Sequence, residues 1–378
     1  MIKQLSVCFL TGLLVASCSP KKPINQQTND ELTMLVGAYT SSGTSKGIYT
    51  FRFNTETGES TPLAETEASH ASYLTLSADG KWVYAVNEYS DDRAAVSAYT
   101  FDKEKGTLHL LNSQPTGGGD PCYIITTGKS VITANYTGGS ISIFPLQEDG
   151  SLLPVSSLIS FTGSGLDKSR QASPHLHCVH LTPDGKYLFA TNLGTDKIHK
   201  FVINPQAGAD TPLLAAGEPD AFPLPAGTGP RHITFAPNGK YAYLISELSG
   251  QVIAFTYADG MLNEIQSIAA DTLNARGSAD IHISGDGKFL YASNRLKADG
   301  IAIFKIDEAT GTLTKVGYQL TGIHPRNFNI TPNGKFLLVA CRDSNVIQIY
   351  ERNKETGVLT DTKQDIKLDA PFCVKFAD

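Results

Sequence analysis

The chain contains 378 residues, of which 41% are hydrophobic and 18% are charged, as in a globular protein with one large or two ordinary domains. Its formal net charge is −6 at pH 7, and like charges are not grouped in blocks. This balance argues against nucleic acid and against an anionic lipid surface as partners, and favours a small molecule.

Residues 1–17 predict a signal peptide. Lys3 gives a short basic start, and the apolar run LSVCFLTGLLVAS is too short for a comfortable membrane span. The sequence LVASC, residues 14–18, resembles the lipobox of bacterial lipoproteins, in which the cysteine is lipidated, so we expect lipidation at Cys18, with ordinary secretory cleavage as the alternative. Residues 18–32 are polar and predict a flexible tether. We therefore expect an exported protein, lipid-anchored to a bacterial membrane and facing the periplasm.

A repeat runs through the rest of the chain. Each unit has a turn followed by an alternating apolar run, as in SADGKWVYAVNE, TPDGKYLFATNL and APNGKYAYLISE. Asp-Gly or Asn-Gly between two apolar runs predicts a hairpin with a type I′ turn, because such residues tolerate its positive φ angles. The turn glycines, 47 to 57 residues apart, are Gly80, Gly128, Gly185, Gly239, Gly287 and Gly334.

Further strands follow each hairpin, for example QVIAFTY and GIAIFKI, which gives four strands per unit and no convincing helix. Four-stranded units at this period predict a β-propeller. Six units are complete, while residues 371–378 supply one innermost strand and residues 33–63 the outer three strands of a seventh blade. We therefore predict an all-β, seven-bladed β-propeller over residues 33–378, a monomer whose ring is closed by pairing the C-terminal strand with the N-terminal blade, which removes exposed sheet edges.

Four cysteines lie in the predicted propeller, namely Cys122, Cys178, Cys341 and Cys373. They occur in apolar strand-like runs, without a C-x-x-C pair or a His/Cys cluster at zinc spacing. We expect small buried hydrophobic side chains, although an exported location leaves a disulfide open.

Alignment of the repeats predicts that ionisable residues meet at one channel mouth. The innermost strand of a blade runs along the channel and the next strand returns antiparallel, so the start of one and the end of the other share a mouth. The first position holds Ser72, Cys122, His177, Arg231, Ala279 and Arg326, with His70, His175 and His324 two residues upstream. The second position holds Glu88, Tyr136, Leu193, Glu247, Arg295 and Arg342.

This cluster has two interpretations. In the first, the charged side chains form a ring of ion pairs with one another and have no catalytic role. Alternatively, arginines bind an anion or a developing oxyanion, and a carboxylate or a histidine activates water, which suits the opening of a lactone ring. Alternation along the strand points His232 away from the side that Arg231 faces, so Arg231 is the stronger candidate.

Several stretches in order, including GTGPRHITFAPNGKYAYLISEL, SPHLHCVHLTPDGKYLFATNLGTDKI and GIHPRNFNITPNGKFLLVACRDSNVIQIY, closely resemble the lactonase family of seven-bladed propellers. This family includes cycloisomerase-type 6-phosphogluconolactonases and the fungal carboxy-cis,cis-muconate cyclase. The resemblance covers the chain from about Thr33 onward. It implies the same fold, a hydrolase of carbohydrate and glucose metabolism, and a site of one histidine, two arginines and one glutamate without a metal.

By motif, the first arginine falls on Arg231, the glutamate on Glu247, the histidine on His175 or His177, and the second arginine on Arg295. The catalytic candidates are therefore His177, Arg231, Glu247 and Arg295, and the substrate-binding candidates are His175, His232, Arg326, Glu88 and Arg342. No cofactor or metal is expected.

The predicted export signal departs from this assignment, because 6-phosphogluconolactone is a cytoplasmic intermediate. The first hypothesis is 6-phosphogluconolactonase-type hydrolysis of a sugar lactone. The alternatives are a non-catalytic periplasmic propeller that binds a ligand or partner, a lactone cycloisomerase, and a metal-dependent lactonase. In the last, Glu88 and Glu247 with Asn87 or Asn294 supply oxygen ligands, although the neighbouring arginines oppose a cation.

Overall fold

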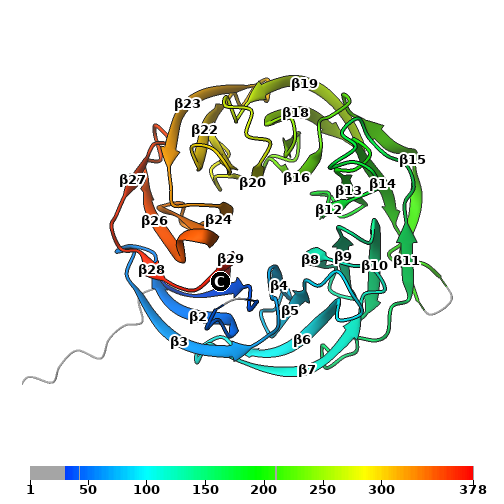
Figure 1. Ribbon diagram of the computed structural model, residues 1–378, viewed down its shortest axis with the longest axis horizontal. Coiled ribbons are helices and arrows are strands. Elements are labelled where there is room, and N and C mark those ends of the chain that lie inside the picture. Colours follow the sequence, from blue (N-terminus) through cyan, green and yellow to red (C-terminus); the bar gives the residue numbers. More distant parts are fainter. Residues whose placement is uncertain (1–29, 42, 209–210, 378) are drawn as a thin grey trace, which may run out of the picture.

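Seven antiparallel sheets stand around a central channel in the computed structural model, which describes residues 30–41, 43–208 and 211–377 (Figure 1). The strands next to the channel are β4 (Leu74–Leu76), β8 (Pro121–Thr126), β12 (Leu176–Leu181), β16 (Pro230–Phe235), β20 (Ser278–Ile283), β24 (Pro325–Ile330) and β29 (Pro371–Ala377). The second strands are β5 (Trp82–Asn87), β9 (Ser130–Asn135), β13 (Tyr187–Asn192), β17 (Tyr241–Ser246), β21 (Phe289–Asn294), β25 (Phe336–Cys341) and β1 (Glu31–Ala38).

The third strands are β6 (Ala95–Asp102), β10 (Ser140–Pro145), β14 (Lys197–Ile203), β18 (Gln251–Ala258), β22 (Gly300–Ile306), β26 (Val346–Arg352) and β2 (Gly47–Asn54). The outermost strands are β7 (Thr107–Pro115), β11 (Ser157–Ser160), β15 (Leu214–Pro223), β19 (Met261–Ala269), β23 (Leu313–Leu320) and β3 (Ser60–Glu67). In the remaining blade, two short segments, β27 (Leu359–Asp361) and β28 (Ile366–Lys367), both pair with β26. The predicted seven-bladed propeller is confirmed.

The two ends of the chain close the ring. Strand β29 pairs antiparallel with β1, with Thr33 opposite Ala377 and Val36 opposite Val374. Strand β1 begins at Glu31, which faces Asn54 of β2, so the sheet starts two residues before the predicted boundary at Thr33. The predicted signal peptide and Cys18 lie outside the described residues. Within those residues, the helical structure is one 3-10 turn at Arg342–Ser344, and no helix is long and apolar enough to cross a bilayer.

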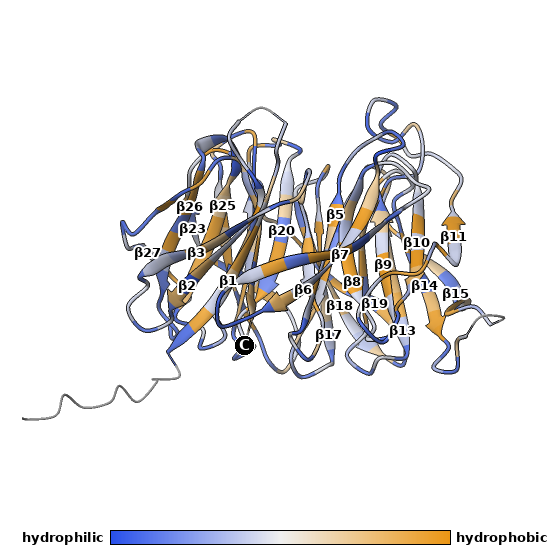
Figure 2. Ribbon diagram, turned by 90° about the horizontal axis from the view of Figure 1, so that it is seen from below, coloured by the Kyte–Doolittle hydropathy of each residue, from blue (hydrophilic) through white to orange (hydrophobic). Residues whose placement is uncertain are grey.

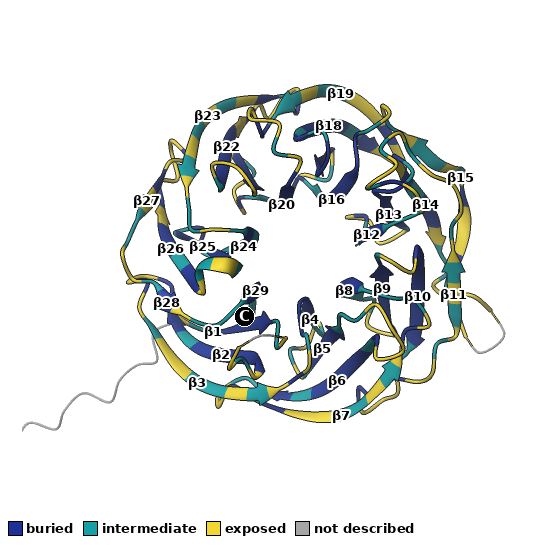
Figure 3. Cartoon of the chain, in the orientation of Figure 1, coloured by how far each residue is buried: buried dark blue, intermediate teal, exposed yellow. Residues whose placement is uncertain are grey.

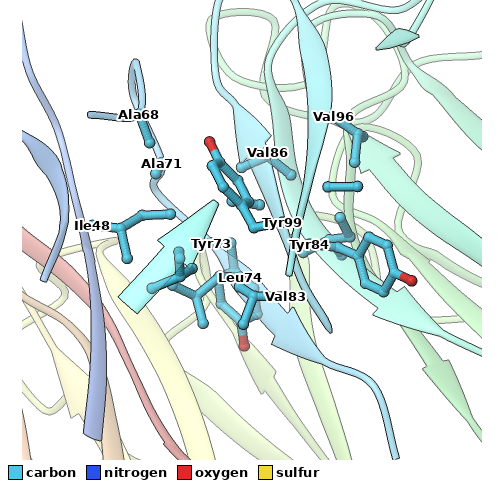
Figure 4. Close-up of a cluster of buried hydrophobic side chains, with 14 of the residues drawn as sticks. Ile48, Ala68, Ala71, Tyr73, Leu74, Val83, Tyr84, Val86, Val96 and Tyr99 are labelled. Carbon is cyan, nitrogen blue, oxygen red and sulfur yellow. The ribbon is translucent and has the colours of Figure 1, made fainter. Parts of the chain in front are cut away.

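The hydrophobic core fills the spaces between neighbouring blades. Strands such as β17 and β21 are buried along their whole length because a blade covers each of their faces, whereas outermost strands such as β7 alternate with solvent (Figure 3). Figure 4 shows one interface, where Ile48 of β2 and Tyr73 and Val83 of the next blade belong to a single buried cluster. Hydrophilic residues concentrate in the loops at both ends of the ring (Figure 2). Binding and catalytic residues can therefore lie in these loops, which do not form the core.

The hairpin turns differ from the predicted type I′ geometry. Gly80 has a φ of 69°, but Asp79 before it does not have a positive φ. The backbone N–H of Gly80 donates to the Ser77 carbonyl at 2.9 Å, and the Asp79 carboxylate accepts the N–H of Lys81 at 3.2 Å. This is a type I turn followed by a left-handed glycine. The same glycine hydrogen bond recurs at Gly185, Gly239, Gly287 and Gly334.

The four cysteines Cys122, Cys178, Cys341 and Cys373 are buried and carry free thiols. They pack as small hydrophobic side chains, as the sequence predicts.

Candidate active site

A cavity of about 270 Å³ opens at one mouth of the channel. Its volume is near the lower limit of about 300 Å³ for small-ligand pockets. It is lined by Glu88, Asp120, Cys122, Tyr136, Arg170, His177, Glu247 and Arg326. The structure thus brings Glu88, His177, Glu247 and Arg326 together from separate blades, as the repeat alignment predicts.

A β-bulge at the start of the innermost strands delivers several of these side chains. In β8, β12, β16 and β24 the pairing register shifts around one residue, which has no partner in the second strand. The unpaired residues are Cys122, His177, Arg231 and Arg326. A bulge leaves one residue outside the ladder and redirects its side chain, which here places it at the mouth.

Glu247 lies among three arginines. Its Oε1 accepts a hydrogen bond from Arg170 Nη2 at 2.6 Å, and its Oε2 accepts one from Arg231 Nε at 2.9 Å. Arg295 Nη2 lies 3.4 Å from the same Oε2. Burial raises the pKa of Glu247, but the charges of Arg295, Arg231 and Arg170 outweigh it and hold the pKa at about 2. The carboxylate is therefore ionised at neutral pH, with both oxygens occupied.

Arg295 and Arg342 belong to a network around His324. Arg295 Nε donates to the Gly277 carbonyl at 2.8 Å, and its Nη1 lies 3.1 Å from His324 Nε2. The other ring nitrogen of His324 lies 3.2 Å from Arg342 Nη2, and Arg342 Nε donates to Asp343 at 2.6 Å. Neither arginine lines the cavity. Arg295 thus donates to the Gly277 carbonyl and pairs with Glu247, and Arg342 donates to Asp343, while the neutral His324 ring can accept from only one of the two arginines.

Arg326 differs from the other arginines, because its donors are largely free. Its Nη2 lies 3.9 Å from Glu88 Oε1, and its guanidinium carbon lies 4.3 Å from the centre of the Phe372 ring. Its Nε is buried and has no hydrogen-bond partner among the described residues. Glu88 instead accepts the Ser72 hydroxyl. Because Arg326 lines the cavity and its guanidinium makes no hydrogen bond to the described residues, it favours a bound anion over a self-satisfied ring of charges.

His177 is buried and lines the same cavity from β12, three blades around the ring from β24, which carries Arg326. Its ring centre is 5.4 Å from that of Tyr136, and its Nδ1 is 3.8 Å from the Cys122 thiol. Burial, then the positive charges of Arg231, His232 and Arg326, lower the pKa of His177 well below 6.5. Burial and the charge of Glu88 raise the pKa of the Cys122 thiol well above 9. At neutral pH, His177 is therefore an uncharged proton acceptor, and Cys122 is a protonated thiol.

His232 corrects one prediction. It does not point away from the side of Arg231: its Nε2 lies 3.3 Å from Arg231 Nη1, and its ring centre lies 5.2 Å from that of His177. The prediction was wrong because the bulge interrupts the alternation of the strand. His232 is nevertheless buried outside the cavity lining, and its Nδ1 lies 2.7 Å from the Asp280 carboxylate. Since the His232 Nδ1–H donates to the Asp280 carboxylate, Nε2 is left to accept from Arg231, so His232 positions Arg231.

His175 and Arg170 act through Tyr136 and Glu247. The His175 ring stacks on Tyr136 with centres 4.3 Å apart and supports a wall residue rather than lining the cavity. Arg170 was absent from the sequence-based candidates because it lies between β11 and β12, outside the aligned hairpins. One signal was available, since this segment lies in the longest interval between turn glycines, 57 residues from Gly128 to Gly185.

Glu88 and Glu247 line one cavity, but the two asparagines of the metal-dependent alternative are hydrogen-bonded elsewhere. Asn87 donates to the Ser69 carbonyl and accepts the Ser97 hydroxyl, so its amide is used inside its own blade. Asn294 accepts the Ser278 hydroxyl at 2.6 Å. Among the described residues, no three histidine, cysteine or acidic side chains are grouped to hold a metal ion. The three guanidinium groups around Glu247 also repel a metal cation at that carboxylate.

Comparisons with known proteins show the family and agree with the seven-bladed fold. The family model described as lactonase, seven-bladed β-propeller, matches residues 33–376. A 6-phosphogluconolactonase from Formosa agariphila is 41% identical over 341 residues, covering 88% of this chain and 96% of that protein. A crystal structure from Bacteroides fragilis matches with a TM-score of 0.92 and 68% identity, covering 93% of this chain and 99% of that one. The periplasmic gluconolactonase of Pseudomonas aeruginosa matches with a TM-score of 0.86 and 33% identity, covering 92% and 99%.

Proposed function

Because the chain belongs to the family of seven-bladed β-propeller lactonases, we propose that it hydrolyses sugar lactones at this channel mouth, with 6-phosphogluconolactonase-type activity. The observation that carries the proposal is one cavity lined by Arg326, whose guanidinium makes no hydrogen bond to the described residues, and, from across the channel, by the uncharged His177. An oxyanion binder and a proton acceptor that face one cavity are what ester hydrolysis by water requires.

The reaction follows from these two residues. Water attacks the lactone carbonyl carbon while His177 accepts one of its protons, so a carbon–oxygen bond forms. Arg326 donates to the oxyanion of the tetrahedral intermediate, where an always-charged donor is most effective. The bond between the carbonyl carbon and the ring oxygen then breaks, and the proton passes from His177 to that oxygen. The products are a carboxylate and a free hydroxyl on one open chain, with one proton released by the acid.

The proton acceptor is His177 rather than Glu247, an assignment that the sequence leaves open. Both Glu247 oxygens already accept hydrogen bonds from arginines, so neither is free to accept a proton from water. Its carboxylate instead fixes Arg170 and Arg231 at the mouth. The cavity lining holds two arginines, Arg170 and Arg326, and three carboxylates, Glu88, Asp120 and Glu247, while Arg231 and Arg295 pair with Glu247 from outside the lining. Glu247 is thus neutralised by its arginines, and Arg326 is the lining cation left to bind an anionic substrate or product.

The test is hydrolysis of glucono-δ-lactone and 6-phosphogluconolactone by the purified protein, with and without EDTA. The rate is measured from the protons that the product acid releases. We expect hydrolysis above the spontaneous rate and no effect of the chelator. If the protein hydrolyses neither lactone, the non-catalytic alternative is favoured. Loss of activity on chelation would revive the metal-dependent one.

We also propose that the protein is exported and held at a membrane through Cys18. The support is the lipobox-like LVASC sequence, together with the periplasmic location named for the Pseudomonas aeruginosa relative. Such a location favours lactones other than the cytoplasmic phosphorylated sugar. Cys18→Ala is expected to move the protein from the membrane fraction to the soluble fraction without changing its rate on glucono-δ-lactone. Retention of the variant in the membrane fraction would contradict lipid anchoring.

A further inference from the structure

A second cavity, which we call the outer cavity, adjoins the catalytic one and has about twice its volume, about 560 Å³. It is formed by four loops, which follow β1, precede β4, follow β5 and precede β8. Glu88 and Asp120 line both cavities. A molecule seated against Arg326 and His177 can therefore extend past these carboxylates into the outer cavity.

Neutral hydrogen-bonding groups dominate the outer cavity. Thr40, Ser41, Ser69 and Ser90 supply four hydroxyl groups, of which that of Thr40 also bonds His70 and that of Ser69 also contacts the Tyr89 hydroxyl. Hydroxyls act as donors and acceptors, and the Glu88 and Asp120 carboxylates add acceptors at the shared edge. This combination matches the alternating donors and acceptors of a polyhydroxy compound.

A stack of planar groups forms one wall of the outer cavity. The His70 ring lies on the Tyr89 ring with centres 4.4 Å apart, and the Arg93 guanidinium carbon lies 4.0 Å from the Tyr89 centre. The Tyr89 hydroxyl contacts the Ser69 hydroxyl. Tyr89 is thus the central member of the stack, and its removal takes away the wall without touching Arg326, His177 or Glu247.

The positive groups of this wall are not available to an anion. Arg93 makes a bidentate pair with Asp91, with Nε to Oδ1 at 2.9 Å and Nη2 to Oδ2 at 2.7 Å. His70 accepts the backbone N–H of Thr40 at 3.2 Å, and burial, opposed by Glu88, lowers the pKa of its ring. The carboxylates at the shared edge repel a second anion. The outer cavity therefore favours a neutral sugar over a phosphate group.

We propose that the outer cavity is a glycosyl-binding subsite and that the natural substrate is the lactone of a disaccharide acid, whose second sugar occupies this space. This inference rests on the proposed lactonase function. The anionic product end stays with the arginines of the catalytic cavity, and the neutral sugar unit contacts the hydroxyl groups and the Tyr89 wall.

The experiment compares four substrates: glucono-δ-lactone, 6-phosphogluconolactone, the 4-O-linked lactobionolactone and the 6-O-linked melibionolactone. We expect kcat/KM for one of the disaccharide lactones to exceed that for glucono-δ-lactone by about tenfold, the effect of one or two added hydrogen bonds. Tyr89→Ala, which removes the wall, and Ser90→Trp, which fills the cavity, are each expected to reduce this advantage by roughly five- to tenfold. Tyr318→Ala, a change at a partly exposed tyrosine of the outermost strand β23, is expected to keep it.

Two outcomes would overturn the subsite. The first is that the wild type shows no preference for either disaccharide lactone, or that Tyr89→Ala and Ser90→Trp slow glucono-δ-lactone equally. The second is that these variants selectively weaken hydrolysis of 6-phosphogluconolactone, which would assign the outer cavity to the phosphate group.

A binding measurement separates this inference from the proposed function. If the protein hydrolyses no lactone, the lactonase proposal fails, and calorimetric titration with lactobionate and gluconate still decides the subsite. Tighter binding of lactobionate that is lost in Tyr89→Ala would support it. Equal affinity for the two acids would reject it.

Discussion

At the scale of single residues, the carboxyl group of Glu247 links stability to pH. Its pKa falls from a usual 4.5 to about 2 in the folded protein. A lowered acid pKa stabilises the fold fully above about pH 4.5, and this contribution is lost as pH falls toward 2. The shift corresponds to about 3 kcal/mol of unfolding free energy. In denaturant titrations at several pH values, Glu247→Gln should flatten the decline of the unfolding free energy over this range. Glu67→Gln, at an exposed side chain, should leave the decline unchanged. If the unfolding free energies of the wild type and Glu247→Gln fall in parallel with pH, the assignment is contradicted.

Arg326 and Arg295 should respond differently to substitution. Arg326 lines the cavity and makes no hydrogen bond to the described residues, so Arg326→Ala is expected to lower kcat/KM for glucono-δ-lactone about a hundred- to thousandfold with little change in melting temperature. Arg295 is buried against Glu247 and the Gly277 carbonyl, so Arg295→Ala should cost about 3 kcal/mol of stability. Kinetics and thermal unfolding of both variants check this, and the reverse pattern would make Arg295 the anion binder.

The pH profile tests the charge state of His177. Because burial and nearby positive charges lower its pKa well below 6.5, the ring stays uncharged around neutral pH. After subtraction of the spontaneous reaction, kcat/KM should therefore be level between about pH 6 and 8. A decline with an apparent pKa near 6.5 would mean that the working base is an unperturbed histidine elsewhere.

At the scale of strands and turns, the hairpin glycines provide a test that does not involve the site. Gly80 has a φ of 69°, and no atom lies within 4 Å of an added Cβ, so the cost of a side chain is conformational only. Gly80→Ala should lower the free energy of unfolding by about 1 kcal/mol, and Gly80→Asn by less, because asparagine tolerates this conformation better. Thermal unfolding measures both, and activity should not change. An unchanged melting temperature for Gly80→Ala would contradict the left-handed assignment.

The same scale shows why some side-chain directions escaped prediction. The repeat gives the correct strand starts, and so places Arg231, Glu247 and Arg326 at one mouth. It does not reveal the bulge that sets the direction of His232, because alternation presumes an unbroken ladder. A signal was present: Pro121, Pro230 and Pro325 open three of the four bulged strands. Proline is tolerated as the first residue of a strand or at a bulge, but not in the interior of a central strand.

At the scale of the whole molecule, the fold was predictable because each blade repeats one pattern and cannot bury both faces alone. The apolar run of β17, for example, is buried on both sides only when neighbouring blades pack against it. The pairing of β29 with β1 was likewise predictable, since one orphan strand and three unmatched strands lie at opposite ends of the chain. The contact of Arg170 with Glu247 was not predictable, because Arg170 lies in a loop outside the repeat and the fold alone brings it to Glu247.

The central claim, that the channel mouth hydrolyses sugar lactones with His177 as proton acceptor, is tested most directly by the rate of glucono-δ-lactone hydrolysis in His177→Gln. The matched control is His109→Gln, at an exposed histidine of β7. We predict that the wild type and the control exceed the spontaneous rate, and that His177→Gln loses about a hundred- to ten-thousandfold in kcat. A wild type no faster than the spontaneous reaction, or a correctly folded His177→Gln protein with the full rate, would contradict the account.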